Sequence, residues 1–131
     1  MRKSASPVLM YNVFMDRTEV IKYIHEHYPC REEHPWADTP NHATFKHLEN
    51  KKWFALVADV DRSKLGIAEL GKIDFINLKN DPNLITSLRR EPGILPAYHM
   101  NKEHWLTALL DGSVDTELLK ALIETSFEMT E

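Results

Sequence analysis

The sequence predicts an α+β fold in two layers, with helices packed on one face of an antiparallel sheet. Three observations predict it: apolar residues recur at helical spacing in three separate segments, short apolar runs occur in pairs joined by turn residues, and the two kinds of segment alternate along the chain. Strands joined as hairpins pair antiparallel, and the helices then bury their apolar stripes against the sheet. The expected order is α-β(3)-α-β(2)-α.

The first helix is predicted to begin at Asp16, whose carboxylate can cap free backbone N–H groups, with Glu19 three residues later as in a capping box. One apolar stripe at helical spacing follows, formed by Val20, Ile21, Ile24 and Tyr28. Pro29 then ends the helix.

The segments on either side of this helix have weaker patterns. Residues 8–14 form a short apolar run, compatible with a packed N-terminal arm over residues 1–14 or with an additional half-turn. Residues 31–42 contain two prolines and no apolar period, which predicts a polar loop.

A β-hairpin is predicted next, because residues 43–48 and 53–60 are apolar runs joined by the turn residues Glu49-Asn50-Lys51-Lys52. The second run is apolar on both faces, which is typical of a central strand with cover on each side. We therefore expect at least two of Trp53, Phe54 and Leu56 to be mostly buried. Residues 59–71 are charged and contain two glycines, which predicts a loop, and residues 73–78 alternate as a third strand.

Asp81-Pro82 predicts the start of a second helix, since Asp caps the first turn and Pro lacks an N–H that would be unpaired there. Leu84, Ile85 and Leu88 are expected to face inward. Residues 94–99 and 104–110 predict a second hairpin around residues 100–103. A last helix from Asp115 onward is expected to bury Leu118, Leu119, Leu122, Ile123 and Phe127.

Composition predicts one globular domain over residues 1–131. The chain is 43% hydrophobic and 27% charged, and its single cysteine, Cys30, excludes an internal disulfide. No apolar run approaches the roughly 20 residues of a membrane span, so we expect a cytoplasmic protein without a membrane partner. The net charge of −4 is uneven: residues 111–131 hold six acids against one lysine, and residues 1–110 hold fifteen basic residues against fourteen acids. Most nucleic-acid binders are far more basic.

Four stretches carry a resemblance to a known family. Pro96-Ala97-Tyr98-His99-Met100-Asn101-Lys102-Glu103-His104-Trp105, followed by Leu110-Asp111-Gly112-Ser113, resembles the P-x-x-H-[LM]-N-K-x-H-W and L-D-G-S signature of the MmcQ/YjbR family of small bacterial proteins. Pro35-Trp36 and Lys52-Trp53-Phe54-Ala55-Leu56 are similar to that family's P-[FW] loop and first hairpin, whereas residues 59–72 and Thr107-Ala108 depart from its pattern. The resemblance implies a two-layer fold similar to the secretion chaperones, and a DNA-binding assignment that rests on fold analogy.

The signature supplies the first candidate site residues. Alternate side chains on a hairpin share a face, so His99 is expected beside Asn101, with His104 across the turn. In a functional interpretation, Lys102 meets a phosphate, Asn101 forms hydrogen bonds and Trp105 stacks on a base. In a structural interpretation, Asn101 closes the turn, Trp105 anchors the hairpin under the helices, and the histidines pair with backbone groups.

Basic residues near the predicted turns complete the candidate set. Lys51 and Lys52 flank the first hairpin turn, and Lys79 stands at the passage from strand to helix. If both hairpins project as wings, Lys51, Lys52 and Lys102 can approach one phosphate backbone together.

No motif indicates an enzyme, a metal site or a cofactor. The histidines lack metal-ligand spacing: His25 and His27 point to different faces of a helix, and His34, His42 and His47 are spread over a loop and a strand. The four glycines are scattered, which excludes a phosphate-binding loop of known spacing.

The functional prediction is therefore a non-enzymatic module that contacts DNA weakly through its two hairpins. One alternative is a protein-interaction module that presents its sheet and helices to a client segment. Another is a small-ligand pocket lined by His99, His104 and Trp105. Salt dependence separates the first from the others, because phosphate contacts weaken steeply as salt rises.

Overall fold

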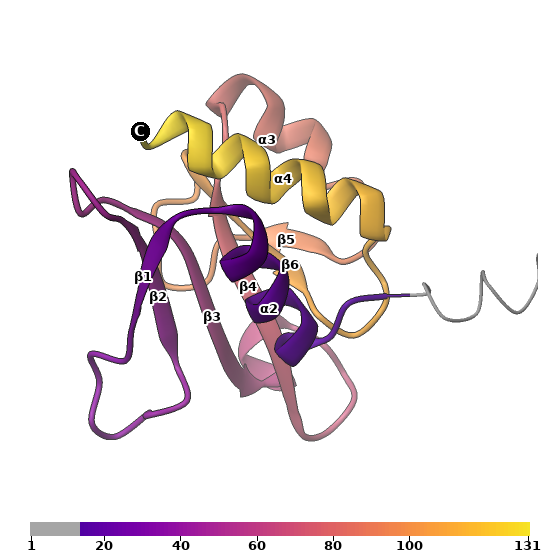
Figure 1. Cartoon of the computed structure of the whole chain (residues 1–131). Coiled ribbons are helices and arrows are strands. Elements are labelled where there is room, and N and C mark those ends of the chain that lie inside the picture. Colours follow the sequence, from indigo (N-terminus) through magenta and orange to yellow (C-terminus); the bar gives the residue numbers. More distant parts are fainter. Residues whose placement is uncertain (1–13) are drawn as a thin grey trace, which may run out of the picture.

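The computed structural model describes residues 14–131, which form an α+β fold with a six-stranded antiparallel sheet (Figure 1). The helices are α2 (Arg17–His27), α3 (Pro82–Leu88) and α4 (Thr116–Met129). The strands are β1 (Cys30–Glu33), β2 (Ala43–His47), β3 (Trp53–Asp61), β4 (Lys72–Lys79), β5 (Ile94–Pro96) and β6 (Trp105–Leu109), in the sheet order β1-β2-β3-β4-β6-β5. The predicted fold class is confirmed. Apart from Phe14, the predicted N-terminal arm lies outside the described residues.

The sheet has one strand more than the sequence predicted. Residues 30–33, expected to be a helix exit and the start of a loop, form the edge strand β1, which pairs with β2 from Cys30↔His47 to Glu33↔Thr44. Polar residues dominate this short strand and give no alternating apolar signal, so its structure depends on pairing with its neighbour. Charged residues are typical of an edge strand, and Glu33 here forms a 2.8 Å ion pair with Lys46 of β2.

Each helix begins where the sequence predicted a cap. The carboxylates of Asp16, Asp81 and Asp115 accept hydrogen bonds from backbone N–H groups two or three residues ahead, at 2.8–3.0 Å. One inward-facing assignment was wrong: Leu84 is 52% exposed, because the seven-residue α3 contacts the body through Ile85 and Leu88.

The larger core lies between the sheet and the pair α2 and α4, which cross the same face in Figure 1. The helices contribute Val20, Ile24, Leu119, Leu122 and Ile123 to it, while Leu118 and Phe127 are partly buried at its margin. Ser126 of α4 fastens this layer, since its buried hydroxyl donates to the Phe54 carbonyl at 2.5 Å and accepts from the Lys79 N–H at 2.9 Å.

A β-bulge near the start of β3 decides which side chains face the helices. Phe45 pairs with Ala55 but the next residue, Lys46, pairs with Trp53, so Phe54 is an extra residue in β3. The bulge turns Phe54 into the helix-side core beside Ala55 and leaves Trp53 on the opposite face with Leu56. The predicted central strand is confirmed, with Phe54 fully buried and Trp53 and Leu56 partly buried.

The opposite face of the sheet carries a smaller apolar cluster, against which none of the helices α2, α3 and α4 of the described residues packs. Ala58, Ile73, Phe75 and Leu109 are its buried members. The segment expected to be a loop over residues 59–71 is more regular than predicted: β3 runs to Asp61, and a short 3-10 helix (Arg62–Leu65) follows. Leu65 and Ile67 from this segment pack on the cluster, so part of this face is covered, and among residues 14–131 the rest is open.

Candidate functional site

The open face of the sheet holds a groove of about 540 Å³. Leu56 and Ala58 of β3 and Phe75 of β4 form its floor. Two loops rise beside this floor: the β1–β2 loop contributes Trp36, Asp38, Thr39 and His42, and the β5–β6 loop contributes Tyr98, His99 and Met100. Ligand sites in proteins are typically concave, of this size, and lined by aromatic and apolar groups with a few polar ones.

Hydrogen bonds to two buried polar residues fix the β5–β6 wall. Asn77 of β4 and Thr107 of β6 are paired neighbours with 0% exposure, and the Thr107 hydroxyl donates to Asn77 Oδ1 at 2.5 Å. The same hydroxyl accepts the Tyr98 N–H at 2.9 Å, and the Asn77 amide donates to the Tyr98 carbonyl at 3.0 Å. The loop therefore folds back over the sheet and holds Tyr98 against Phe75, with ring centroids 5.9 Å apart.

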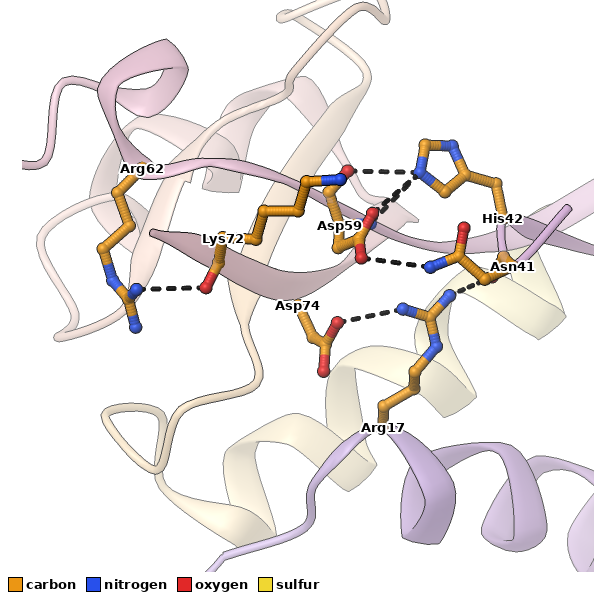
Figure 2. Close-up of polar contacts among 7 residues, drawn as sticks. All are labelled: Arg17, Asn41, His42, Asp59, Arg62, Lys72 and Asp74. Atoms are coloured by element: carbon orange, nitrogen blue, oxygen red, sulfur yellow. Dashed lines mark hydrogen bonds and ion pairs between the residues drawn. The ribbon is translucent and has the colours of Figure 1, made fainter. Parts of the chain in front are cut away.

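A polar network fastens the other wall to the end of β3 (Figure 2). The Nε2 atom of His42 lies 3.1 Å from both the carboxylate and the carbonyl oxygen of Asp59, and the Asn41 amide donates to the same carboxylate at 3.0 Å. Arg17 of α2 donates to the Asn41 carbonyl and forms a 2.9 Å ion pair with Asp74 of β4. The network thus joins the β1–β2 loop to the helix layer and to two strands.

The charge of Asp59 is stabilised within this network. Partial burial alone would raise the pKa of its carboxyl group, but the hydrogen bonds from His42 and Asn41 outweigh burial and bring the pKa below its ordinary value. Asp59 is therefore ionised at neutral pH and remains an acceptor for both loop residues.

Aromatic rings meet at right angles in the groove. Trp36 and Trp53 have ring centroids 5.9 Å apart with an interplanar angle of 90°, and Phe75 and Tyr98 are 5.9 Å apart at 76°. Trp36 is 37% exposed although it is large and apolar. Such edge-to-face contacts are favourable in themselves, and the partly exposed Trp36 leaves ring surface available to a ligand.

By strand order, the segments that carry the predicted lysines meet one end of the sheet, and Lys102 also lines a depression beside the groove. Lys51 and Lys52 lie in the β2–β3 turn, Lys79 ends β4 beside Trp105, and Lys102 is exposed in the β5–β6 loop. The C-terminal end of α4 lies at the same end, because the Asn50 amide donates to the Thr130 carbonyl at 2.9 Å. Glu128 and Glu131 accompany that helix end, so the lysines share this region with acids.

Among the other signature residues, Asn101 agrees with the structural interpretation and Trp105 does not. Asn101 closes the turn as its structural interpretation required: its Oδ1 accepts the N–H groups of Glu103 at 2.8 Å and His104 at 3.2 Å. The assignment of Trp105 beneath the helices was wrong. It is half-buried, and strand alternation places it with Thr107 and Leu109 on the face opposite α2 and α4.

His99 also lies elsewhere than predicted. It is in the β5–β6 loop and not on strand β5, with a left-handed φ of 56° that is uncommon for a residue other than glycine. Its ring stacks on Tyr98, with centroids 4.1 Å apart. Of the three residues expected to line a pocket, His99 lines this groove, and His104 and Trp105 lie outside its lining.

Outside the groove, Glu32 of β1 joins two histidines. Its two carboxylate oxygens lie 2.7 Å from Nε2 of His25 and 2.7 Å from Nε2 of His34. Between residues 14 and 131, however, no group of three or more His, Cys, Asp or Glu side chains could hold a metal ion. Burial, and then the nearby Glu32, raises the pKa of Cys30 to about 11, so its thiol is protonated at neutral pH and poorly nucleophilic.

The Glu32 cluster predicts a pH-dependent contribution to stability. Burial tends to raise the pKa of Glu32, yet the two histidine hydrogen bonds lower it below 4.5 overall. The hydrogen bond to Glu32, and then one to the Pro40 carbonyl, raises the pKa of His34 above 6.5. The carboxylate contribution is therefore present above pH 4.5 and lost on acidification, and the histidine contribution is complete below pH 6.5 and lost as pH rises through the raised pKa.

We expect the Tm difference between the wild type and Glu32→Gln to be largest between pH 4.5 and 6.5 and to shrink on both sides. The stability change should stay below about 1 kcal/mol, because these side chains are partly exposed and solvent screens them. Thermal melts at several pH values test this, with exposed Glu26→Gln on α2 as the control. A Tm difference that is constant with pH contradicts the prediction.

Sequence reasoning did not identify most of the groove. Trp36 was placed in a polar loop, Trp53 and Leu56 were expected to be strand core, and Tyr98 was only part of a motif. The available signal was that two motifs of the family resemblance lie far apart in the sequence, Pro35-Trp36 and the segment from Pro96 to Trp105. In the structure these two motifs form the two walls of one groove.

Among the helices between residues 14 and 131, none combines the length and the hydropathy that crossing a bilayer requires.

Comparison with known proteins gives a consistent result. The sequence model of the YjbR family matches residues 25–129. The Bacillus subtilis protein YyaQ is 39% identical over 116 residues, which cover 88% of this chain and 98% of YyaQ. Escherichia coli YjbR is 35% identical over 63 residues, covering 47% of this chain and 53% of that protein.

Solved structures agree with the sequence relatives. A crystal structure of a Pseudomonas syringae protein has a TM-score of 0.87 and 45% identity, covering 89% of this chain and all of that one. A crystal structure from Deinococcus radiodurans has a TM-score of 0.67 and 27% identity, covering 90% of this chain and 80% of that one. Because the family match spans most of the residues and one relative is covered almost end to end, the chain belongs to the YjbR family, as its MmcQ/YjbR-like signature implied.

Proposed function

We propose that this protein is a binding module that holds a small organic ligand in the groove on the open face of its sheet. One observation carries the proposal: the two segments with the family motifs form opposite walls of a single aromatic groove. Buried hydrogen bonds fix the β5–β6 wall, and the Asp59 network fixes the β1–β2 wall. A preformed, apolar groove with few polar groups is well suited to a small ligand.

Trp36→Ala tests this function. The Trp36 side chain is 37% exposed in a loop, so its removal should weaken ligand binding at least about tenfold while changing stability little. The measurement is ligand-observed NMR with a fragment mixture of neutral, cationic and anionic molecules. Leu84→Ala is the control, since Leu84 is exposed on α3 outside the groove. The proposal fails if no fragment binds the wild type, or if Trp36→Ala weakens the binding of none by about tenfold or more.

A second candidate function is weak contact with DNA at the lysine-bearing end of the sheet. The observation that favours it is the shared location of Lys51, Lys52, Lys79 and Lys102, on adjacent elements of one sheet end. His99, Asn101 and His104 belong to the same loop as Lys102. The acids at the end of α4 oppose such binding, because they repel phosphate groups.

The triple substitution of Lys51, Lys52 and Lys102 by Ala should therefore abolish what duplex binding exists at low salt. Each lysine that contacts a phosphate adds about 0.9 to the magnitude of the slope of log affinity against log salt, so these three lysines should contribute at most about 3 to the wild-type slope. Fluorescence anisotropy of labelled duplex at two salt concentrations measures both the loss of binding in the triple variant and the salt slope of the wild type. Absence of binding at low salt, or binding that the triple variant retains, eliminates this candidate.

A further inference from the structure

We infer that the groove's ligand is an organic cation with apolar substituents on its nitrogen, such as a quaternary ammonium group. The inference rests on the proposed function and specifies the chemistry of the site. It follows from two independent properties of the lining, namely the arrangement of its aromatic rings and the sign of its charge.

Two tryptophan rings stand perpendicular to each other at one side of the groove: Trp36 and Trp53 meet at 90°. Phe75 is buried in the floor, and Tyr98 lies over it with one ring face stacked on His99. The face of an aromatic ring carries the negative part of its quadrupole and attracts a cation, most strongly for Trp. Perpendicular rings that line one groove can therefore contact different sides of a single alkylated ammonium group, whose methyl groups also suit apolar walls.

The formal charge of the lining also favours a cationic ligand. Asp38 is its charged residue at neutral pH, and no Lys or Arg occurs among the described lining residues. Asp59 lies behind this wall, where His42 and Asn41 hold its carboxylate. A cation would thus enter a region of favourable potential, whereas a carboxylate or phosphate would find no basic partner within the lining.

Two lysines beside the groove supply a competing outcome of the test. Lys64 and Lys102 line an adjacent depression that shares Tyr98 and His99 with the groove. A ligand with a negative group could extend across the shared wall toward them. The test therefore compares three molecules of the same shape and different charge.

Choline, 3,3-dimethylbutan-1-ol and 3,3-dimethylbutanoate each carry a tert-butyl-like head and differ in charge. We expect choline to bind the wild type at least about tenfold more tightly than the neutral alcohol, because a cation within an aromatic site gains about that factor. Trp36→Leu should reduce this preference, since leucine keeps an apolar surface without a ring face, and Asp38→Asn should reduce it as well. NMR titrations of the folded variants give all affinities.

Equal affinity for choline and the alcohol, tighter binding of the acid, or no binding of choline overturns the inference. These failures differ from failure of the proposed function. If the alcohol or the acid binds the wild type and Trp36→Ala abolishes that binding, the groove is a ligand site for a different chemical class. If the groove variants change the binding of no fragment, both proposals fail.

Discussion

Phe54→Ala is expected to destabilise the protein by about 3–5 kcal/mol, the usual loss for a large buried aromatic side chain. Phe54 is completely buried on the helix side of the sheet. Its ring lies 4.9 Å from Phe127 and 5.3 Å from His47, between centroids, so its removal leaves a cavity between β3 and α4. This is a large share of the roughly 5–15 kcal/mol that stabilises a domain.

Urea denaturation measures the free energy of unfolding for this variant. Leu84→Ala is the matched control, because it shortens a side chain that is 52% exposed and should change stability by less than about 0.5 kcal/mol. A loss of less than about 1 kcal/mol for Phe54→Ala would show that the bulge does not direct this side chain into the core.

Thr107→Val should be the second largest change, at roughly 2–4 kcal/mol, although valine and threonine have similar shapes. The substitution removes the hydroxyl that accepts the Tyr98 N–H and donates to Asn77 Oδ1. The buried Asn77 Oδ1 and the partly buried Tyr98 N–H then lack this partner, at about 1–2 kcal/mol for each. The β5–β6 wall of the groove should loosen as a consequence.

Two measurements separate this effect from ordinary core damage. Hydrogen exchange at the Tyr98 amide should accelerate in Thr107→Val, because that amide loses its acceptor. Thr107→Ser keeps the hydroxyl and loses one methyl group, so it should retain slow exchange and cost only about 0.8 kcal/mol. Unchanged exchange at Tyr98 in the valine variant would contradict the role assigned to Thr107.

Most of the fold could be predicted because its signals are local. The capping aspartates Asp16, Asp81 and Asp115 each place a helix start through contacts within three residues. Strand β1 could not be predicted, because its hydrogen bonds come from β2, more than ten residues away, and its own residues carry no apolar alternation. Strand assignment at an edge depends on the neighbour.

The groove could be predicted only in part, since its geometry depends on tertiary structure. Simple alternation along β3 would place Trp53 with Val57 on the helix side and Phe54 with Leu56 on the other. The bulge reverses the faces of Trp53 and Phe54, and so brings Trp53 to the groove. Nothing in the local sequence marks that extra residue, and the meeting of Trp36 with Trp53 depends on the path of the β1–β2 loop.

The three tryptophans give the most direct test that the groove is the binding site. Trp36 and Trp53 line it, and Trp105 lies outside its lining at the end of the sheet. In ¹H–¹⁵N spectra recorded during titration with choline, the indole N–H signals of Trp36 and Trp53 should shift together and saturate with one affinity, while that of Trp105 stays in place. Shifts confined to Trp105, or to the amides of Lys51, Lys52 and Lys102, would place the binding site at the end of the sheet and contradict the proposed groove.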